Sequence, residues 1–228
     1  MRLNRLSREL IDAGAIDAMV ARDAPSMRVL SEDERKDSLQ RTLAAKPLED
    51  VWLFGYGSLI WNPTIDFVER RVARVSGWHR AFCLATPAGR GTADNPGLIL
   101  GMDVGGDCEG VAFRIASEMV ESELTTVWKR EMLAAAYVPR WLDLLDERGN
   151  RFASGIAFTI DRDCDRYVGK LERQQIIRRL ATAAGALGSS ADYLFRTCEA
   201  LQAHGIRDDD LEQLRADVTA FQAALVEV

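Results

Sequence analysis

The stretch between Val51 and Ile160 is a series of short strand candidates separated by turn residues, and this pattern restricts the fold more than any other feature. Glycine and proline clusters divide the series, for example at 87–97 and at Gly105–Gly106. Strands at this spacing predict a small closed or strongly curved sheet. The candidates are VWLFGY, RRVARVSGWHRAFCLAT, GLILGMDV, CEGVAFRI, YVPRWLDLLD and RFASGIAFTI.

Helical sequence interrupts this series once and then follows it. Residues 117–133 can begin at Ser117 as an N-cap, with acidic residues in the first turns. Three helical stretches come after Asp161, at 170–188, 189–206 and 208–228. The layout predicts an α+β fold with a C-terminal helical layer. The expected caps of these helices are Ser190 and Asp208 at N-termini and Gly188 and Gly205 at C-termini.

The 228 residues suffice for one domain with a substantial core and a small appendage. Residues 1–46 are polar and carry the charge run SEDERKDSLQ, so we expect a partly helical N-terminal arm. The main domain is predicted over 47–228. It divides into a β-rich core at 47–160 and a helical layer at 161–228.

Charge and composition argue against several classes of function. The formal net charge of -6 is opposite to what a nucleic-acid surface needs. No run approaches 18 apolar residues, so no membrane span is predicted. No zinc site or other metal site is predicted, because the spacing typical of metal ligands is absent among His79, His204 and the cysteines. We expect reduced thiols and a cytoplasmic protein, because no secretory signal precedes the cysteines, which are Cys83, Cys108, Cys164 and Cys198.

Within VWLFGYGSLIWNP, a strand pattern breaks into Gly-Tyr-Gly-Ser and then returns to apolar residues. One interpretation is a hairpin turn that only reverses the chain. The other is a loop that presents consecutive amide groups to a carboxylate or an oxyanion, since Gly55 and Gly57 can adopt conformations closed to other residues. A serine hydrolase is disfavoured at Ser58, because the G-x-S-x-G elbow is absent.

Glu131 falls on the apolar stripe of the helix predicted at 117–133, together with Leu124, Val127 and Trp128. Burial beside Trp128 would raise the pKa of this carboxylate toward the range of a general base. The neighbouring cations, Lys129 and Arg130, are expected to project elsewhere.

A structural interpretation of the same residues remains open. Glu131 would then lie at a helix end and pair with an arginine such as Arg140. His79 is expected to be structural. Arg80 and Arg90 are undecided between a role in the fold and a bidentate contact with a substrate carboxylate.

Several motifs follow one another in a definite order and spacing: FGYGSLIWNP, GWHRAFC, RGT with NPGLILGMD, GVAFR and WKREMLAAAYVPRW. Each motif is weak alone, and the set is specific. Taken together they resemble those of the ChaC family, the glutathione-specific γ-glutamylcyclotransferases. The similarity covers roughly residues 50–215 and includes GIRDDDLEQL near its end.

The resemblance implies a γ-glutamylcyclotransferase fold, which is a small mixed β-barrel or curved sheet with helices around it. It also implies release of 5-oxoproline and Cys-Gly from glutathione without a metal or organic cofactor. The family's catalytic glutamate corresponds to Glu131, and a tyrosine near the substrate corresponds to Tyr137. The family's Y-G-S-L loop, which holds the γ-glutamyl group, corresponds to Tyr56, Gly57, Ser58 and Leu59, with Gly55 leading in.

This chain departs from the family in the spacer before Tyr137. Relatives often carry a glycine there, and this chain has Ala134, Ala135 and Ala136. The departure concerns the local backbone and not the carboxylate.

Two alternatives stand beside glutathione cleavage: a cyclotransferase for other γ-glutamyl amines, and a non-catalytic binding module of the same fold. The sequence leaves the oligomeric state open.

Overall fold

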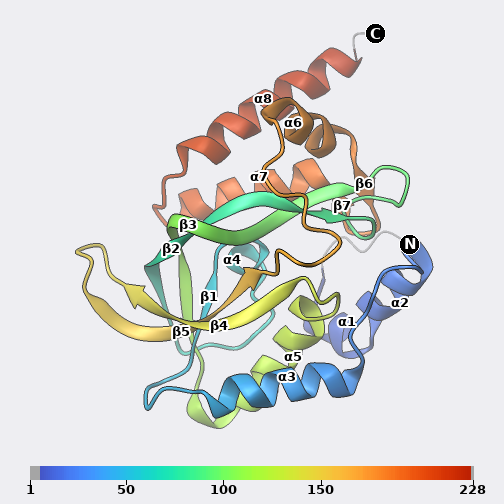
Figure 1. Ribbon diagram of the computed structural model, residues 1–228. Coiled ribbons are helices and arrows are strands. Elements are labelled where there is room, and N and C mark those ends of the chain that lie inside the picture. Colours follow the sequence, from blue (N-terminus) through green and yellow to red (C-terminus); the bar gives the residue numbers. More distant parts are fainter. Residues whose placement is uncertain (1–5, 227–228) are drawn as a thin grey trace.

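A closed β-barrel lies at the centre of the structure, a computed structural model that describes residues 6–226 (Figure 1). Its strands follow the order β1-β3-β2-β4-β5, and parallel pairing of β1 with β5 closes the ring of otherwise mainly antiparallel strands. The predicted α+β fold with a small mixed barrel is therefore confirmed. The strands are β1 (Trp52–Gly55), β2 (Glu69–Thr86), β3 (Gly97–Arg114), β4 (Tyr137–Leu145) and β5 (Arg151–Ile160).

The glycine pair Gly105–Gly106 lies inside β3, so its expected role as a separator of two strands is wrong. Both residues have left-handed φ values, of 106° and 67°. The pairing with β2 passes from Trp78↔Val104 to Ser76↔Asp107, which leaves two residues of β3 opposite one of β2. This is a β-bulge, and glycine allows the strand to bend there and continue.

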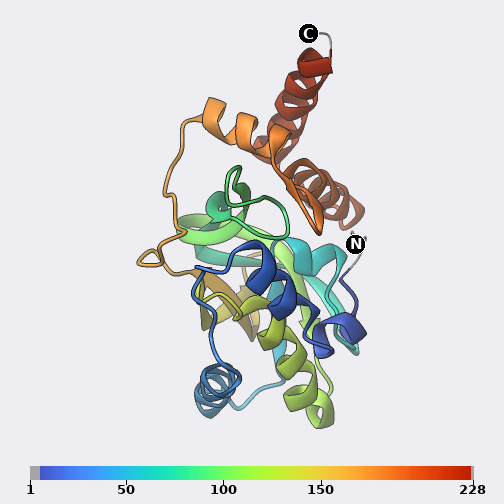
Figure 2. The same ribbon diagram turned by 90° about the vertical axis from the view of Figure 1, so that its right-hand side faces the viewer.

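The C-terminal helices cover one side of the barrel, at the top of Figure 1, and α8 extends furthest from it (Figure 2). The predicted cap at Asp208 is confirmed, since its Oδ1 accepts the N–H of Leu211 at 3.0 Å. Two other caps differ from expectation. Ser189 and not Ser190 caps α7, and Gly188 lies in a short strand. The elements are α6 (Arg173–Thr182), β6 (Ala184–Gly185), β7 (Gly188–Ser189), α7 (Ser190–Ala203) and α8 (Asp209–Val226).

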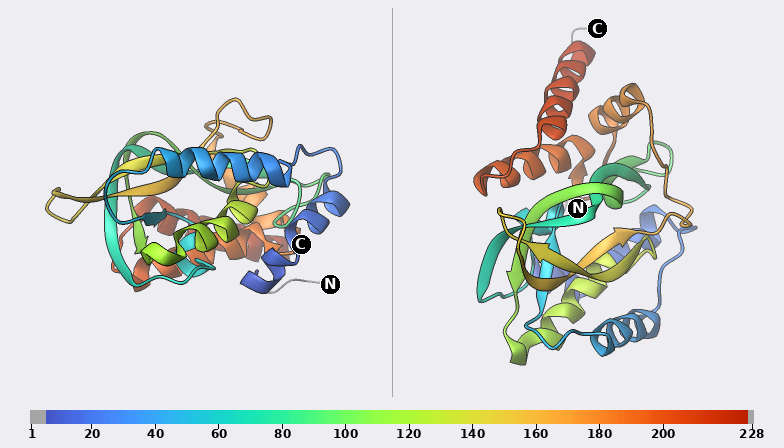
Figure 3. Two further views of the ribbon diagram at one scale, coloured as in Figure 1. Left: turned by 90° about the horizontal axis from the view of Figure 1, so that it is seen from below. Right: turned by 60° about the vertical axis from the view of Figure 1, so that its left-hand side comes forward.

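On the opposite side, α5 (Val120–Glu131) packs between the barrel and α3 (Glu32–Ala44), as Figures 1 and 3 show. A 3₁₀ turn at Ser117–Met119 precedes α5, so Ser117 does not cap it directly. The indole of Trp128 is buried against Phe158 and donates to Ser38 Oγ of α3 at 3.2 Å. The apolar stripe predicted for this helix therefore faces the core.

The N-terminal arm contains α1 (Arg8–Asp12) and α2 (Ala15–Asp23), which lie in front of the barrel in Figure 2. The two helices share a hydrophobic cluster with residues far along the chain, including Ala88 and Leu133. Residues 1–5 of the predicted arm and 227–228 of the predicted helical layer lie outside the described residues. Over residues 6–226, no helix has the length and apolar character needed to cross a membrane.

Candidate active site

A cavity of about 200 Å³ lies between the segment after β1, the end of α5, the start of β4 and the N-terminal arm. It gathers residues from distant parts of the chain. Gly55, the last residue of β1, does not line it. The other residues expected to bind substrate or to catalyse do line it, namely Tyr56, Gly57, Ser58, Leu59, Glu131 and Tyr137.

The Y-G-S-L segment connects β1 to the short helix α4 (Ser58–Trp61), so the hairpin interpretation is wrong. The first N–H groups of a helix have no acceptor within it, which leaves such amides available to other groups. At Gly57 a side chain has no room, because an added Cβ would lie 2.7 Å from the hydroxyl oxygen of Tyr193. Close packing against Tyr193 explains the glycine in this loop.

Glu131 is the last residue of α5, and its side chain is only 14% exposed. Burial raises the pKa of this carboxyl group above its ordinary value of 4.5, and the adjacent Arg130 guanidinium opposes the shift in part. The helix-end position in the structural interpretation is correct. The partner is Arg130 Nε at 2.9 Å from Glu131 Oε1, whereas Arg140 donates to Thr159.

Arg130 does not project away from the site, contrary to the expectation from helix periodicity. Its side chain is 8% exposed, and Nη2 donates to Ser58 Oγ at 2.7 Å. Nη1 donates to the main-chain carbonyl of Asn62. Because α5 ends one residue later, a long side chain from this position can turn toward the cavity. Arg130 thus joins Glu131 to the Y-G-S-L loop, which the residue pattern alone did not indicate.

Three tyrosines lie near Glu131 and stay neutral. Burial raises the pKa of Tyr56, Tyr137 and Tyr193, and the Glu131 carboxylate contributes to each shift. The hydroxyl of Tyr56 donates to the Phe158 carbonyl at 2.8 Å, and that of Tyr137 donates to the Leu100 carbonyl at 3.0 Å. Tyr193 was not identified from the sequence, where it belongs to an ordinary helical pattern 62 residues beyond Glu131.

The two arginines left undecided have different positions. Arg80 does not line the cavity. Its Nη1 donates to the Tyr56 carbonyl at 2.8 Å, and its Nε lies 3.0 Å from Asp208 Oδ2. Arg90 lines the cavity and is largely buried, with burial lowering its pKa. Arg166 and Arg196 also line it, so guanidinium groups outnumber the carboxylate of Glu131 there.

The histidines stand apart from this site. His79 is exposed, and its Nδ1 lies 2.9 Å from the carbonyl oxygen of Gly105. His204 is the C-cap of α7. Neither lines the cavity, and Ser58 Oγ accepts from Arg130, so neither histidine can act as a general base for Ser58.

The alanine spacer has one residue in a left-handed conformation. Ala135 has φ of 48°, a region that suits glycine and strains an L-residue by roughly 1–2 kcal/mol. Glycine loses more chain entropy on folding, roughly 0.5–1 kcal/mol, which offsets part of that gain. We expect Ala135→Gly to raise the free energy of unfolding by about 0.5 kcal/mol.

Urea unfolding measures this effect, with Ala134→Gly as the control. Ala134 is not among the positive-φ residues, so glycine there brings only the entropic penalty and lowers stability. A loss of stability in Ala135→Gly as large as that in Ala134→Gly would contradict the strained conformation.

The chain is similar to proteins of known activity. The model of the ChaC-like protein family matches residues 51–221. Glutathione-specific γ-glutamylcyclotransferase from Escherichia coli K12 is 44% identical over 194 residues, which cover 85% of this chain and 84% of that protein. Glutathione-specific γ-glutamylcyclotransferase 1 from Danio rerio is 28% identical over 152 residues, 65% of this chain and 78% of its own length.

The fold is similar to that of a solved structure as well. The crystal structure of a yeast γ-glutamyl cyclotransferase specific to glutathione aligns with a TM-score of 0.69 at 20% identity. The alignment covers 98% of the yeast chain and 76% of this one. Nearly all of the yeast chain therefore has a counterpart here, while about a quarter of this chain has none there.

Proposed function

This chain belongs to the ChaC-like protein family, and we propose that it is a glutathione-specific γ-glutamylcyclotransferase in which Glu131 moves the proton. The enzyme releases 5-oxoproline and Cys-Gly from glutathione. The observation that carries the proposal is the Glu131 carboxylate, nearly buried in the wall of the cavity and with a raised pKa.

The reaction is an intramolecular transfer. The free α-amine of the γ-glutamyl group attacks its own γ-carbonyl carbon, a C–N bond forms and closes a five-membered lactam, and the C–N bond to cysteine breaks. Water is not consumed. Well-oriented intramolecular reactions reach effective molarities of roughly 10⁵–10⁸ M, so the protein has to fold the substrate and move a proton.

Glu131 is suited to both proton steps. The α-amine is an ammonium group at neutral pH and must lose a proton before it attacks, while the departing amine of Cys-Gly must gain one. A carboxylate with a raised pKa accepts the first proton and returns one to the leaving group. Arg130, 2.9 Å from Glu131, opposes the rise of its pKa and so favours the ionised carboxylate that starts the cycle.

The charges of the remaining lining support an anionic substrate. Glutathione carries two carboxylates, and the cavity is lined by Arg90, Arg130, Arg166 and Arg196. The Y-G-S-L loop at the start of α4 adds main-chain N–H groups for the α-carboxylate or for the developing oxyanion. Tyr137 and Tyr56 form neutral walls near Glu131.

The pH dependence of kcat/KM is expected to have an acidic limb above pH 4.5, the ordinary pKa of glutamate. Glu131 must be ionised to accept the ammonium proton, so activity falls as the pH drops through its raised pKa. Initial rates between about pH 4 and pH 8 at constant ionic strength measure the limb. Full activity down to pH 4.5 would exclude Glu131 with a raised pKa as the base.

The assignment is tested by incubating the purified protein with glutathione and following 5-oxoproline and Cys-Gly by mass spectrometry. γ-Glutamyl-alanine serves as the matched substrate, since it has the same γ-glutamyl group and a different leaving amine. We expect lactam from glutathione at a much higher kcat/KM. A preference for γ-glutamyl-alanine would instead indicate a cyclotransferase for other γ-glutamyl amines, and no lactam from either would indicate a binding module.

We also propose that the protein is cytoplasmic, as expected from its sequence. All four cysteines are free thiols, and reduced glutathione would share that compartment with them.

A further inference from the structure

The N-terminal arm contributes a wall to the active-site cavity. Five of its apolar side chains line the cavity: Leu6, before α1, and a group of four in and after α2, namely Ile16, Met19, Val20 and Met27. The family model begins only at residue 51. The wall is therefore a feature of this chain beyond the segment that the family model describes.

The arm wall, defined by these four residues, lies next to the reacting end of the site. Ile16, Met19 and Val20 share a hydrophobic cluster with Leu133, which follows Glu131 by two residues. The main-chain N–H of Leu30 donates to the Leu133 carbonyl at 2.8 Å. The arm thus packs directly on the segment that leads away from the catalytic carboxylate.

The same wall reaches the loop that carries Arg90. An added Cβ at Gly89 would lie 3.4 Å from Met19 Cε, and Ala88 belongs to the same cluster. Met19 therefore lies beside the segment before Arg90 and shares a hydrophobic cluster with Leu133, from the segment after Glu131. Both segments line the cavity.

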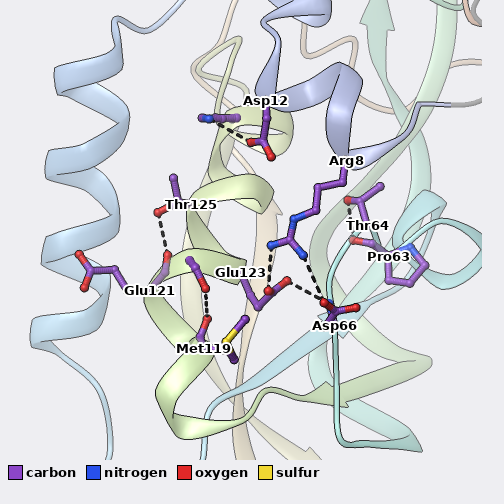
Figure 4. A network of polar contacts seen from close by, with 11 residues as sticks. Arg8, Asp12, Pro63, Thr64, Asp66, Met119, Glu121, Glu123 and Thr125 are labelled. Atoms are coloured by element: carbon purple, nitrogen blue, oxygen red, sulfur yellow. Dashed lines mark hydrogen bonds and ion pairs between the residues drawn. The ribbon is translucent and has the colours of Figure 1, made fainter.

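The arm is firmly held to the rest of the protein (Figure 4). Arg8 Nη2 lies 2.8 Å from Oε1 of Glu123, a residue of α5 with no exposed side-chain surface. Glu123 Oε2 accepts the main-chain N–H of Asp66 at 2.9 Å. The Leu6 carbonyl accepts from Asn62 Nδ2 at 2.8 Å. These contacts anchor the start of the arm to α5 and to the segment that follows α4.

The lining of the cavity combines an apolar wall with guanidinium groups. The arm wall is apolar, whereas Arg90 and Arg196 lie near the ring of Trp61, at 6.0 Å and 5.5 Å from its centre. In glutathione the uncharged cysteinyl side chain comes directly after the bond that breaks, and the glycine carboxylate lies further on. Charge complementarity places the carboxylate near the arginines and the thiol side against the arm.

We propose that the arm wall, with Met19 at its centre, forms the subsite for the cysteinyl side chain of the leaving group and limits its size. This inference rests on the proposed function and deepens it. The unsubstituted cysteinyl side chain, which is small and uncharged, fits the subsite. An alkyl group on the sulfur would collide with the arm, so the wild-type enzyme discriminates against S-alkylated glutathione.

The test compares kcat/KM for glutathione and for S-propylglutathione in wild type, Met19→Ala and Ile11→Ala. A methylene in an apolar pocket alters kcat/KM by roughly 10–200-fold. We expect wild type to prefer glutathione by at least about tenfold and Met19→Ala to reduce that preference about tenfold. Ile11 is buried in the same cluster and does not line the cavity, so Ile11→Ala loosens the packing and leaves the preference unchanged.

Circular dichroism and thermal melts show whether each variant is folded at the assay temperature, and Met19→Leu serves as a second variant that keeps the bulk. It should retain the wild-type preference. An unchanged preference in folded Met19→Ala, or an equal change in Ile11→Ala, would overturn the subsite. Wild type that releases no 5-oxoproline from glutathione would instead overturn the proposed function, so the two failures are distinct.

Discussion

Glu131→Gln is expected to lower kcat for 5-oxoproline release by about 10²–10⁴-fold, the range for loss of a general acid–base group. Glutamine keeps the shape of the side chain and an oxygen that can accept from Arg130 Nε, now 2.9 Å away. It cannot take a proton from the ammonium group of the substrate. The loss should fall on kcat more than on KM, because the affected interactions arise in the transition state.

The variant should remain folded. The amide removes the desolvation penalty of Glu131 but also the charge partner of Arg130, so some stability is lost. Arg130 keeps its bonds to Ser58 and Asn62, which limits that loss. Rates and thermal melts are compared with Glu121→Gln, which changes an exposed glutamate in the first turn of the same helix. Folded Glu131→Gln with more than a tenth of wild-type kcat would be incompatible with the proton-transfer role.

Arg8→Met is expected to destabilise the protein by about 3 kcal/mol, at the lower end of the range for breaking a buried ion pair. Among residues 6–226, Arg8 supplies the only ion pair of Glu123. The Glu123 side chain is inaccessible to water, so removal of the guanidinium leaves a buried charge without a cation. Arg8 is itself 31% exposed, which is why we expect the lower end of the range. Urea unfolding monitored by circular dichroism measures the effect.

Lys129→Met is the matched control, because the Lys129–Asp12 pair joins the same two parts of the chain. Both side chains are about one third or more exposed, at 32% and 45%, so the loss should be below about 1 kcal/mol. In the Arg8→Met background, Glu123→Gln should restore much of the stability, since the amide is neutral and can still accept from Asp66. Equal losses in Arg8→Met and Lys129→Met would contradict an arm anchored by Glu123.

The strand pattern between Val51 and Ile160 was sufficient to predict the barrel, because alternation and turn residues are local properties. The break at Gly105–Gly106 was misjudged for the same reason. A glycine pair ends a strand or forms a bulge depending on the partner strand, and here β2 continues opposite it. Similarly, the helix around Glu131 was predictable from its period, but its end at Glu131 depends on the following chain turning through Ala135.

Glu131 and the Y-G-S-L segment were identified because each breaks a local rule. A carboxylate on an apolar stripe and glycines within a strand pattern are both unusual in one dimension. Arg130, Tyr193 and the arm wall break no such rule. Arg130 is an ordinary charge near a helix C-terminus, Tyr193 is an ordinary helical residue, and Met19 is an ordinary apolar one.

By itself the amino-acid sequence determined the elements, the apolar face of α5 and the residue types that the chemistry needs, because these follow from backbone preferences and from the spacing of side chains along one segment. Tertiary structure alone decided that Arg130 turns into the cavity, that Tyr193 packs on Gly57 and that the N-terminal arm closes the site. These are contacts between segments separated by many residues. They depend on how the segments fill a common volume, which the pattern of any one segment does not contain.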